Sequence, residues 1–126
     1  MVKETVLFVG WGGTFPGREH AGLETYREWV EILEELKGKG EIEDFQTFLL
    51  SPHGGELDGF TLVFADQAKL FELMVREDVE RLRRRALREH AKFSIIPAIG
   101  GQLVEREYEL LEQEVLPRLE RAPVVV

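Results

Sequence analysis

The sequence predicts an α+β fold in which four short strands and two helical segments alternate as strand, helix, strand, strand, helix, strand. Three observations lead to this prediction. Four short runs consist mainly of apolar residues and are bounded by charged or turn-forming residues, as strands are. Two longer segments place their apolar residues on one helical stripe. Glycine, proline and aspartate stand between these segments, where turns and helix caps require them.

The first part of the chain is predicted to form a strand, a helix and a second strand. Residues 5–11 are an apolar run that ends in glycines and predict a strand, and residues 12–17 predict a turn-rich loop. A helix is predicted over residues 18–37, because apolar side chains recur there every three or four positions and glycines follow. Residues 45–50 predict the second strand.

The third strand and the helical segment after it follow a glycine-rich connection. Residues 60–65 alternate phenylalanine and leucine with threonine, valine and alanine and predict the third strand. Asp66 is predicted to cap a helix over residues 67–74, because an aspartate side chain can accept hydrogen bonds from the first helical N–H groups. Asp78 is predicted in the same way to cap a further helix over residues 79–90.

The last part of the chain is predicted to form the fourth strand and a C-terminal helix. Residues 93–99 predict the strand, and Pro97 indicates an edge strand or a strand end, because proline cannot donate to a neighbouring strand. A helix is predicted over residues 102–121, with Pro117 kinking or ending it. The tail over residues 123–126 has no assigned structure.

The order of these elements is that of the ferredoxin-like, or split βαβ, motif. Right-handed crossovers then give an antiparallel sheet with the strand order 4-1-3-2 and the helices on one face. We therefore predict a single domain over residues 1–126. It consists of a ferredoxin-like core over residues 4–99 and the C-terminal helix.

The predicted strands carry apolar side chains on both faces, although helices are predicted to cover only one face. In the first strand Phe8 and Val9 point to opposite faces. Leu62 and Val63 do the same in the third strand. Leaving about eight large apolar side chains in water would forgo on the order of 12 to 20 kcal/mol. Either a second subunit or the C-terminal helix must cover the second face, and we predict a homodimer that pairs through it.

The chain resembles the dimeric α+β barrel proteins, among them the antibiotic-biosynthesis monooxygenase-like, stress-responsive barrel and YCII-like proteins. The resemblance covers residues 4–99 and rests on the element order and on two segments, KGKGEIEDFQTFLL and FADQAKLFELMVREDVERL. It implies a dimer. The group includes enzymes, binding proteins and others, so it implies no single activity, and no functional residue is carried over from it.

Composition excludes several classes of function. The net charge of −8 argues against nucleic acid and anionic lipid as partners, because both attract basic surfaces. The absence of cysteine excludes disulfides, thiolate metal sites and thiol catalysis. We expect a cytoplasmic protein, since no signal peptide or long apolar run stands out. Asparagine is absent and arginine is common, which suits either a thermophilic protein or a GC-rich genome.

Four residues are candidates for a ligand site. His53 stands in the loop before the third strand and could exchange protons near neutral pH, although a solvated turn residue is the ordinary interpretation. Arg18 could hold a carboxylate or phosphate near the first helix, after a glycine-rich loop that fits neither nucleotide-binding pattern. Trp11 and Phe64 could line an apolar pocket, although aromatic residues on strands more often belong to the core.

No metal or cofactor is expected. His20 and His90 have no partner histidine at metal-ligand spacing, and a helix C-terminus would explain His90 by stabilising its charged form. We predict that a small, partly apolar ligand binds behind the first helix. The alternatives are a cofactor-independent monooxygenase or isomerase in which His53 transfers a proton, and a non-catalytic protein-interaction module that uses charged helix faces.

Overall fold

The computed structural model describes residues 4–115. Residues 5–98 form one compact unit, and the described residues on either side, Glu4 and residues 99–115, belong to a second unit that is treated by itself. The elements are β1 (Thr5–Thr14), α1 (Glu19–Gly38), β2 (Asp44–Leu49), β3 (Gly59–Phe64), α2 (Gln67–Met74), α3 (Glu77–Glu89) and β4 (His90–Ile99). Their order confirms the predicted strand and helix sequence.

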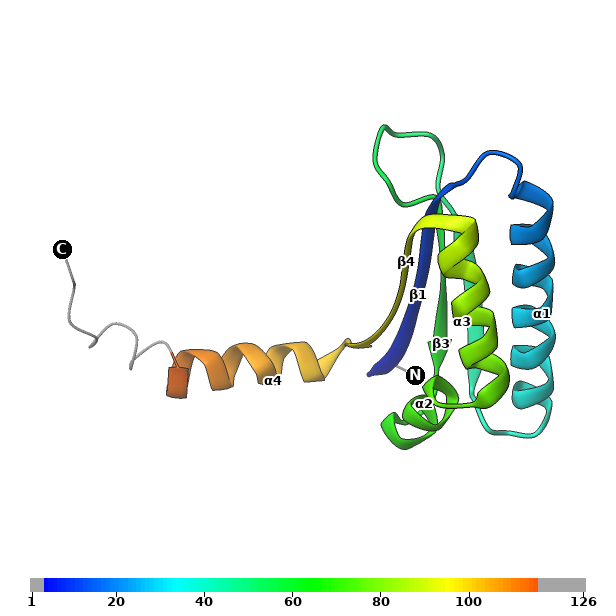
Figure 1. Ribbon diagram of the computed structural model, residues 1–126. Helices are drawn as coiled ribbons and strands as arrows, with labels where there is room; N and C mark the ends of the chain where they lie inside the picture. The colour runs from blue at the N-terminus through cyan, green and yellow to red at the C-terminus, as the bar shows by residue number, and fades with distance from the viewer. Residues whose placement is uncertain (1–3, 116–126) are drawn as a thin grey trace. The chain divides into compact units, whose positions relative to one another are not determined.

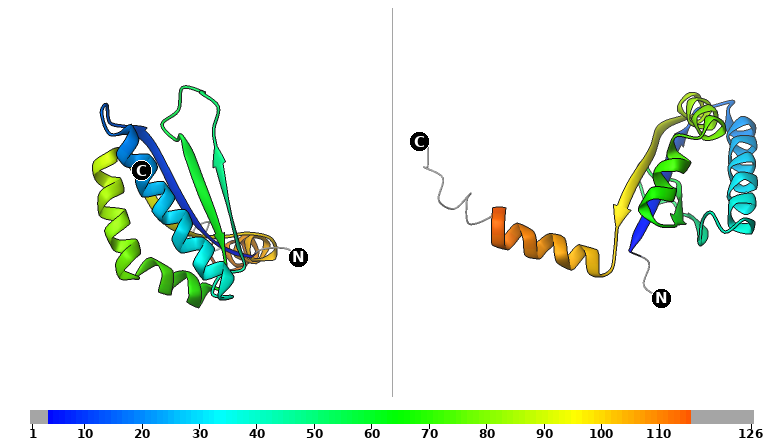
Figure 2. Two further views of the ribbon diagram at one scale, coloured as in Figure 1. Left: turned by 90° about the vertical axis from the view of Figure 1, so that its right-hand side faces the viewer. Right: turned by 90° about the horizontal axis from the view of Figure 1, so that it is seen from below.

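The four strands form one sheet in the order β2-β3-β1-β4, which is the predicted order read from the opposite edge. β3 is antiparallel to both of its neighbours, and Leu62 lies opposite Phe8 on one side and Gln46 on the other. β4 is an edge strand, as Pro97 indicated. The helices of this unit lie on one side of the sheet, with α1 and α3 next to each other (Figures 1 and 2).

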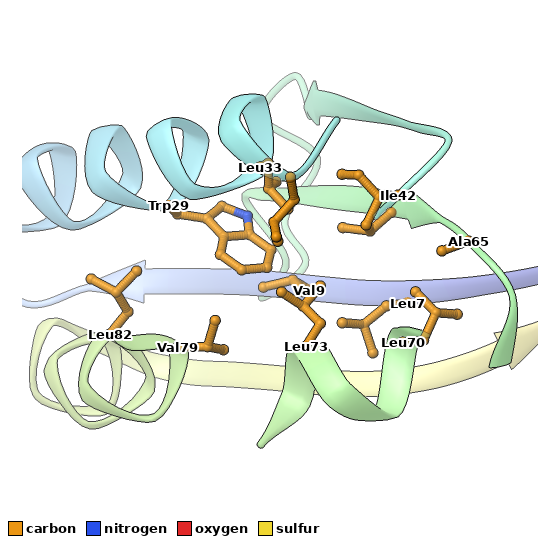
Figure 3. Close-up of a cluster of buried hydrophobic side chains, with 12 residues drawn as sticks. Leu7, Val9, Trp29, Leu33, Ile42, Ala65, Leu70, Leu73, Val79 and Leu82 are labelled. Carbon is orange, nitrogen blue, oxygen red and sulfur yellow. The ribbon is translucent and has the colours of Figure 1, made fainter. Parts of the chain in front are cut away.

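The core lies between the sheet and these helices. Leu7 and Val63 from the strands and Leu33 from α1 are completely buried there. Figure 3 shows how α2 and α3 contribute to the same cluster, through Leu73 and Val79. The apolar stripes that predicted the helices are therefore the surfaces by which the helices pack on the sheet.

The second face of the sheet is also apolar, as predicted. Its side chains come from all four strands, and no helix of residues 5–98 covers them (Figure 1). Phe60 stacks between Phe8 and Phe48, with ring centroids 5.3 Å apart in each pair. Ile96 on β4 is 50% exposed. We call this surface the open sheet face; it consists of Val6, Phe8, Phe48, Phe60, Leu62, Phe64 and Ile96.

Two strands are longer than predicted. β1 continues to Thr14 instead of ending at Trp11, and the loop after β2 bonds to it there. The Asp58 N–H donates to the Trp11 carbonyl over 2.8 Å, and the Gly13 N–H donates to Oδ2 of Asp58 over 2.9 Å. Gly12 is required at this contact, since a Cβ there would stand 1.6 Å from the Glu56 carbonyl oxygen. β4 begins at His90, three residues earlier than predicted.

The helix caps agree with the sequence at one position and differ at another. Asp66 caps α2, and its side chain accepts a hydrogen bond of 2.9 Å from the Lys69 N–H. Asp78 was predicted as the cap of α3, but the helix begins at Glu77 and Arg76 holds the cap position. Asp78 instead lies in the first turn and forms an ion pair of 2.9 Å with Arg76.

The C-terminal helix is present in the second unit as α4 (Gln102–Leu110), followed by a π-helical turn over Leu111–Val115. Residues 116–121 of the predicted helix, with Pro117, and the tail over residues 123–126 lie outside the described part. The single domain predicted for residues 1–126 stays a prediction. Among residues 4–115, no helix is both long enough and apolar enough to cross a membrane.

Candidate functional site

A cavity of about 490 Å³ lies between the helix-covered face of the sheet and helices α1 and α3. This volume is within the range of small-molecule binding pockets, which is roughly 300 to 1,000 Å³. Most of its lining is apolar or aromatic. The side chains come from β1, α1, β2, α3 and β4, and include Val9, Trp11, Tyr26, Leu82, Phe93 and Ile95.

Aromatic side chains form one wall of this cavity. The rings of Trp11 on β1 and Tyr26 on α1 have centroids 5.7 Å apart and are tilted by 49°. Trp29 lies on α1 three residues after Tyr26, so it shares the inward side of the helix. Its indole N–H has no hydrogen-bond partner in the described structure, and the nitrogen lies on the Leu33 side of the ring (Figure 3).

His90 places an imidazole in the cavity wall. It is the first residue of β4, directly after α3, and its Nδ1 lies 3.0 Å from the hydroxyl oxygen of Thr14 at the end of β1. Gly22 on α1 leaves room for the ring, because a Cβ at that position would be 3.4 Å from the His90 Cε1 atom. The ring is therefore held at Nδ1 while it lines the cavity.

Burial lowers the pKa of His90 below its ordinary value of 6.5, although the negative charges of Glu89 and Asp58 act in the opposite direction. The imidazole is therefore mainly neutral at pH 7 and can accept a proton. This result corrects the sequence-based interpretation, in which the end of the helix stabilised a charged His90. The desolvation of the ring outweighs the charges nearby.

We expect His90 to make the folded protein less stable as the pH falls below about 6.5. Because its pKa is lower in the folded protein, the unfolded chain binds more protons between the two pKa values. The free energy of unfolding therefore rises with pH through that window, and the contribution is fully present above 6.5. Replacing His90→Gln should flatten this part of the curve, measured by chemical denaturation between about pH 5 and 8.

His53→Gln is the matched control for this experiment. His53 lies in an exposed loop, where its Nδ1 is 2.9 Å from the Ser51 carbonyl oxygen. The control removes an exposed imidazole and leaves the lining of the cavity unchanged. A His90→Gln curve that is as steep as that of the unmodified protein would contradict the assignment.

Thr25 and Glu89 form a polar pair at the junction of α1 and α3. The Thr25 hydroxyl donates a hydrogen bond of 2.9 Å to Oε2 of Glu89. Thr25 is 7% exposed and Glu89 6%, and Thr25 also lines the cavity. The second carboxylate oxygen of Glu89, Oε1, is buried and has no partner in the described structure. A buried carboxylate oxygen without a hydrogen bond lowers the stability of the fold unless a further donor binds to it.

The structure separates the four candidate residues that the sequence suggested. Trp11 lines the cavity, whereas Phe64 lies on the open sheet face. His53 is in the exposed loop, and Arg18 is exposed directly before α1. His20 forms an exposed pair of 3.0 Å with Glu24. Within residues 4–115, no group of three or more His, Asp or Glu side chains is placed to hold a metal ion.

The sequence alone did not indicate Thr25, Glu89 or His90 as residues of this site. One signal was available for Thr25, which stands four residues before Trp29 on the inward stripe of the helix. A hydroxyl on an otherwise apolar stripe often marks a buried polar contact. Nothing local distinguishes Glu89, which follows a run of arginines and looks like one more charged surface residue.

Comparisons with known proteins agree on the fold. A DABB family protein from Mesorhizobium loti is 18% identical with a TM-score of 0.58, and the match covers 78% of this chain and 98% of that one. A dimeric ferredoxin-like protein from Jannaschia is 12% identical with a TM-score of 0.56, over 75% and 97% of the two chains. An antibiotic biosynthesis monooxygenase is 17% identical with a TM-score of 0.51, over 76% and 96%.

The chain has the ferredoxin-like fold. The resemblance to the dimeric α+β barrel proteins is confirmed at the level of architecture, since similar structures include both DABB and monooxygenase folds. No protein-family model matches the sequence, and no curated protein matches it. At these identities the structural likeness concerns the fold and leaves the activity to be argued from the cavity.

Proposed function

We propose that this protein binds a small, partly apolar molecule in the cavity between the sheet and helices α1 and α3. The observation that carries the proposal is the cavity itself, which has the volume of a ligand pocket and aromatic walls. Trp11 and Tyr26 supply flat apolar surface, and His90, held by Thr14, supplies a polar group. A molecule with a ring or acyl body and one polar substituent suits this lining.

The proposal includes a homodimer that pairs through the open sheet face. Large apolar side chains on that face stay partly exposed in one copy of the chain; Phe48 is 43% exposed and Ile96 50%. An apolar surface of this kind is typical of an interface, because burying it is favourable. Structures with the same fold from Bacteroides fragilis and Jannaschia are described as dimeric. A cytoplasmic location is part of the same proposal.

An enzyme is the second candidate, and His90 favours it. A neutral imidazole in the wall of an apolar cavity can take a proton from a bound substrate. A cofactor-independent monooxygenase or isomerase would use such a group, and an antibiotic biosynthesis monooxygenase shares the fold. The catalytic role of His53 stays a prediction, and so do ligand contacts of Arg18 and Phe64. Loss of turnover in His90→Gln, with turnover kept in His53→Gln, would support His90 as the residue that takes the proton.

A thermal-shift screen of phenolic and acyl compounds tests the binding proposal. A ligand that binds only the folded protein stabilises it by about 2.7 kcal/mol at a hundred times its dissociation constant, so the melting temperature should rise. Gly22→Leu should reduce the rise, since Gly22 lines the cavity and a larger side chain would project into it beside His90. Leucine also favours helix over glycine, so α1 should persist.

Gly38→Leu is the matched control on the same helix. Apart from its chain neighbours and the backbone of its own helix, nothing lies within 4 Å of a Cβ built at Gly38, so the added side chain enters open space and should leave ligand binding unchanged. If no compound of a broad library raises the melting temperature, the binding proposal is wrong. A non-catalytic interaction module that uses charged helix faces would then be favoured.

A further inference from the structure

The pair formed by Thr25 and Glu89 has a consequence for the chemistry of the ligand. The Thr25 hydroxyl has one proton, and it donates this proton to Oε2 of Glu89 over 2.9 Å. A hydroxyl that has given its proton still has lone pairs that can accept a hydrogen bond. Because Thr25 lines the cavity, it presents an acceptor and no donor to a molecule inside it.

The charges around the cavity also disfavour a bound anion. Glu19 lines the cavity, Glu89 lies buried behind Thr25, and the field of Asp58 reaches His90. Among the described lining residues, Arg83 alone carries a permanent positive charge, and its guanidinium is paired with Glu80 over 2.8 Å. Burial strengthens the effect of Glu89, because little water is present to screen it.

A purely structural role explains this pair poorly. A hydrogen bond between α1 and α3 could be made by two neutral side chains, without the cost of burying a carboxylate. Glu89 is 6% exposed, and its Oε1 has no partner in the described structure. Arg85, one helical turn before Glu89 on α3, gives it no compensation, since Arg85 pairs with Glu28 on α1 instead. A buried, half-satisfied carboxylate beside a cavity is therefore a feature that ligand recognition would use.

We propose that Thr25 and Glu89 make the cavity selective for a ligand whose polar substituent is a hydroxyl, as in a phenol or alcohol, and that they exclude the corresponding carboxylate. This inference rests on the ligand binding proposed above. A ligand hydroxyl donates to Oγ of Thr25, which continues the chain of hydrogen bonds to Glu89. A carboxylate has no proton to donate and meets the negative charge of Glu89.

Three probes with one apolar body test this selectivity: 2-naphthol, 2-methoxynaphthalene and 2-naphthoate, titrated at neutral pH with binding measured by calorimetry. We expect the unmodified protein to bind 2-naphthol on the order of tenfold more tightly than the methoxy compound, which lacks the donor. The carboxylate should bind more weakly still. In Glu89→Gln, the preference for naphthol over naphthoate should fall by about tenfold or more.

Variants at Thr25 separate recognition from stability. Thr25→Val removes the acceptor at constant shape, so naphthol and its methyl ether should bind equally well. Thr25→Ser keeps the hydroxyl and should keep the preference, and Glu89→Gln tests the same inference if Thr25→Val does not fold. A purely structural pair would lower the melting temperature of the variants without changing the ratio of affinities between probes.

The possible failures are distinguishable. If the unmodified protein binds naphthol and naphthoate equally well, or if Glu89→Gln leaves their ratio unchanged, the selectivity inference is wrong while the binding proposal stands. If none of the three probes binds the unmodified protein, and the broad thermal-shift screen is also negative, the cavity is not a ligand site and both proposals are wrong.

Discussion

Leu62→Lys is expected to convert the proposed homodimer into monomers. Leu62 lies at the centre of the open sheet face, opposite Phe8 on β1 and Gln46 on β2. In a dimer that pairs through this face, the lysine ammonium would be buried without a partner, which costs several kcal/mol. We expect the dissociation constant to rise by a factor of about 100 or more, since each 1.4 kcal/mol is tenfold.

The measurement is light scattering at micromolar protein concentration, where one chain has a mass of 14.5 kDa. The unmodified protein should have twice this mass, and Leu62→Lys should have the single mass with its secondary structure retained. Leu87→Lys is the control, because Leu87 is on α3, in the helix layer, and is 55% exposed. A monomeric unmodified protein would end the dimer proposal, and a dimeric Leu62→Lys would exclude the open sheet face as its interface.

Leu33→Ala is expected to destabilise the protein by about 2 to 5 kcal/mol, which is a large part of the stability of a typical domain. Leu33 is 0% exposed and belongs to the cluster between α1 and the sheet (Figure 3). The substitution removes apolar contacts and leaves a cavity that a packed interior closes only in part. The free energy of unfolding should be measured in urea at one fixed protein concentration, because dimerisation would contribute to it.

Leu87→Ala makes the same chemical change at a site that is 55% exposed. Its effect should stay within about 0.5 kcal/mol, as is usual for exposed positions. If Leu33→Ala lowers the free energy of unfolding by less than about 1 kcal/mol, the position of Leu33 in the core is contradicted. Truncating a completely buried leucine lowers it by more than this.

The local pattern of apolar, polar and turn-forming residues was enough to predict the architecture. The alternation of side chains along β1 and β3 assigned Phe8 and Leu62 to one face and Val9 and Val63 to the other, because successive residues of a strand point in opposite directions. The cap at Asp66 followed from the same kind of local chemistry, in which a side chain bonds an N–H three residues later. The strand order then followed from the handedness of crossovers.

Local pattern failed where a residue's environment depends on a distant segment. Gly12 predicted a loop, yet it lies within β1, because the chain around Glu56 and Asp58 packs against the strand there. Asp78 had the residue type of a cap, but its ion pair with Arg76 is what the structure shows at that turn. Turn-forming residues therefore predict a loop correctly only when no distant segment packs against them.

The sequence by itself determined the fold class and the two apolar faces of the sheet, because both follow from side-chain periods over a few neighbouring residues. The strand order required the handedness of crossovers in addition. Only the tertiary structure decided the site. Thr25 meets Glu89 across 64 residues of sequence, and Thr14 meets His90 across 76. A carboxylate or an imidazole carries no local sign of burial, so its role is set by which distant segments pack around it.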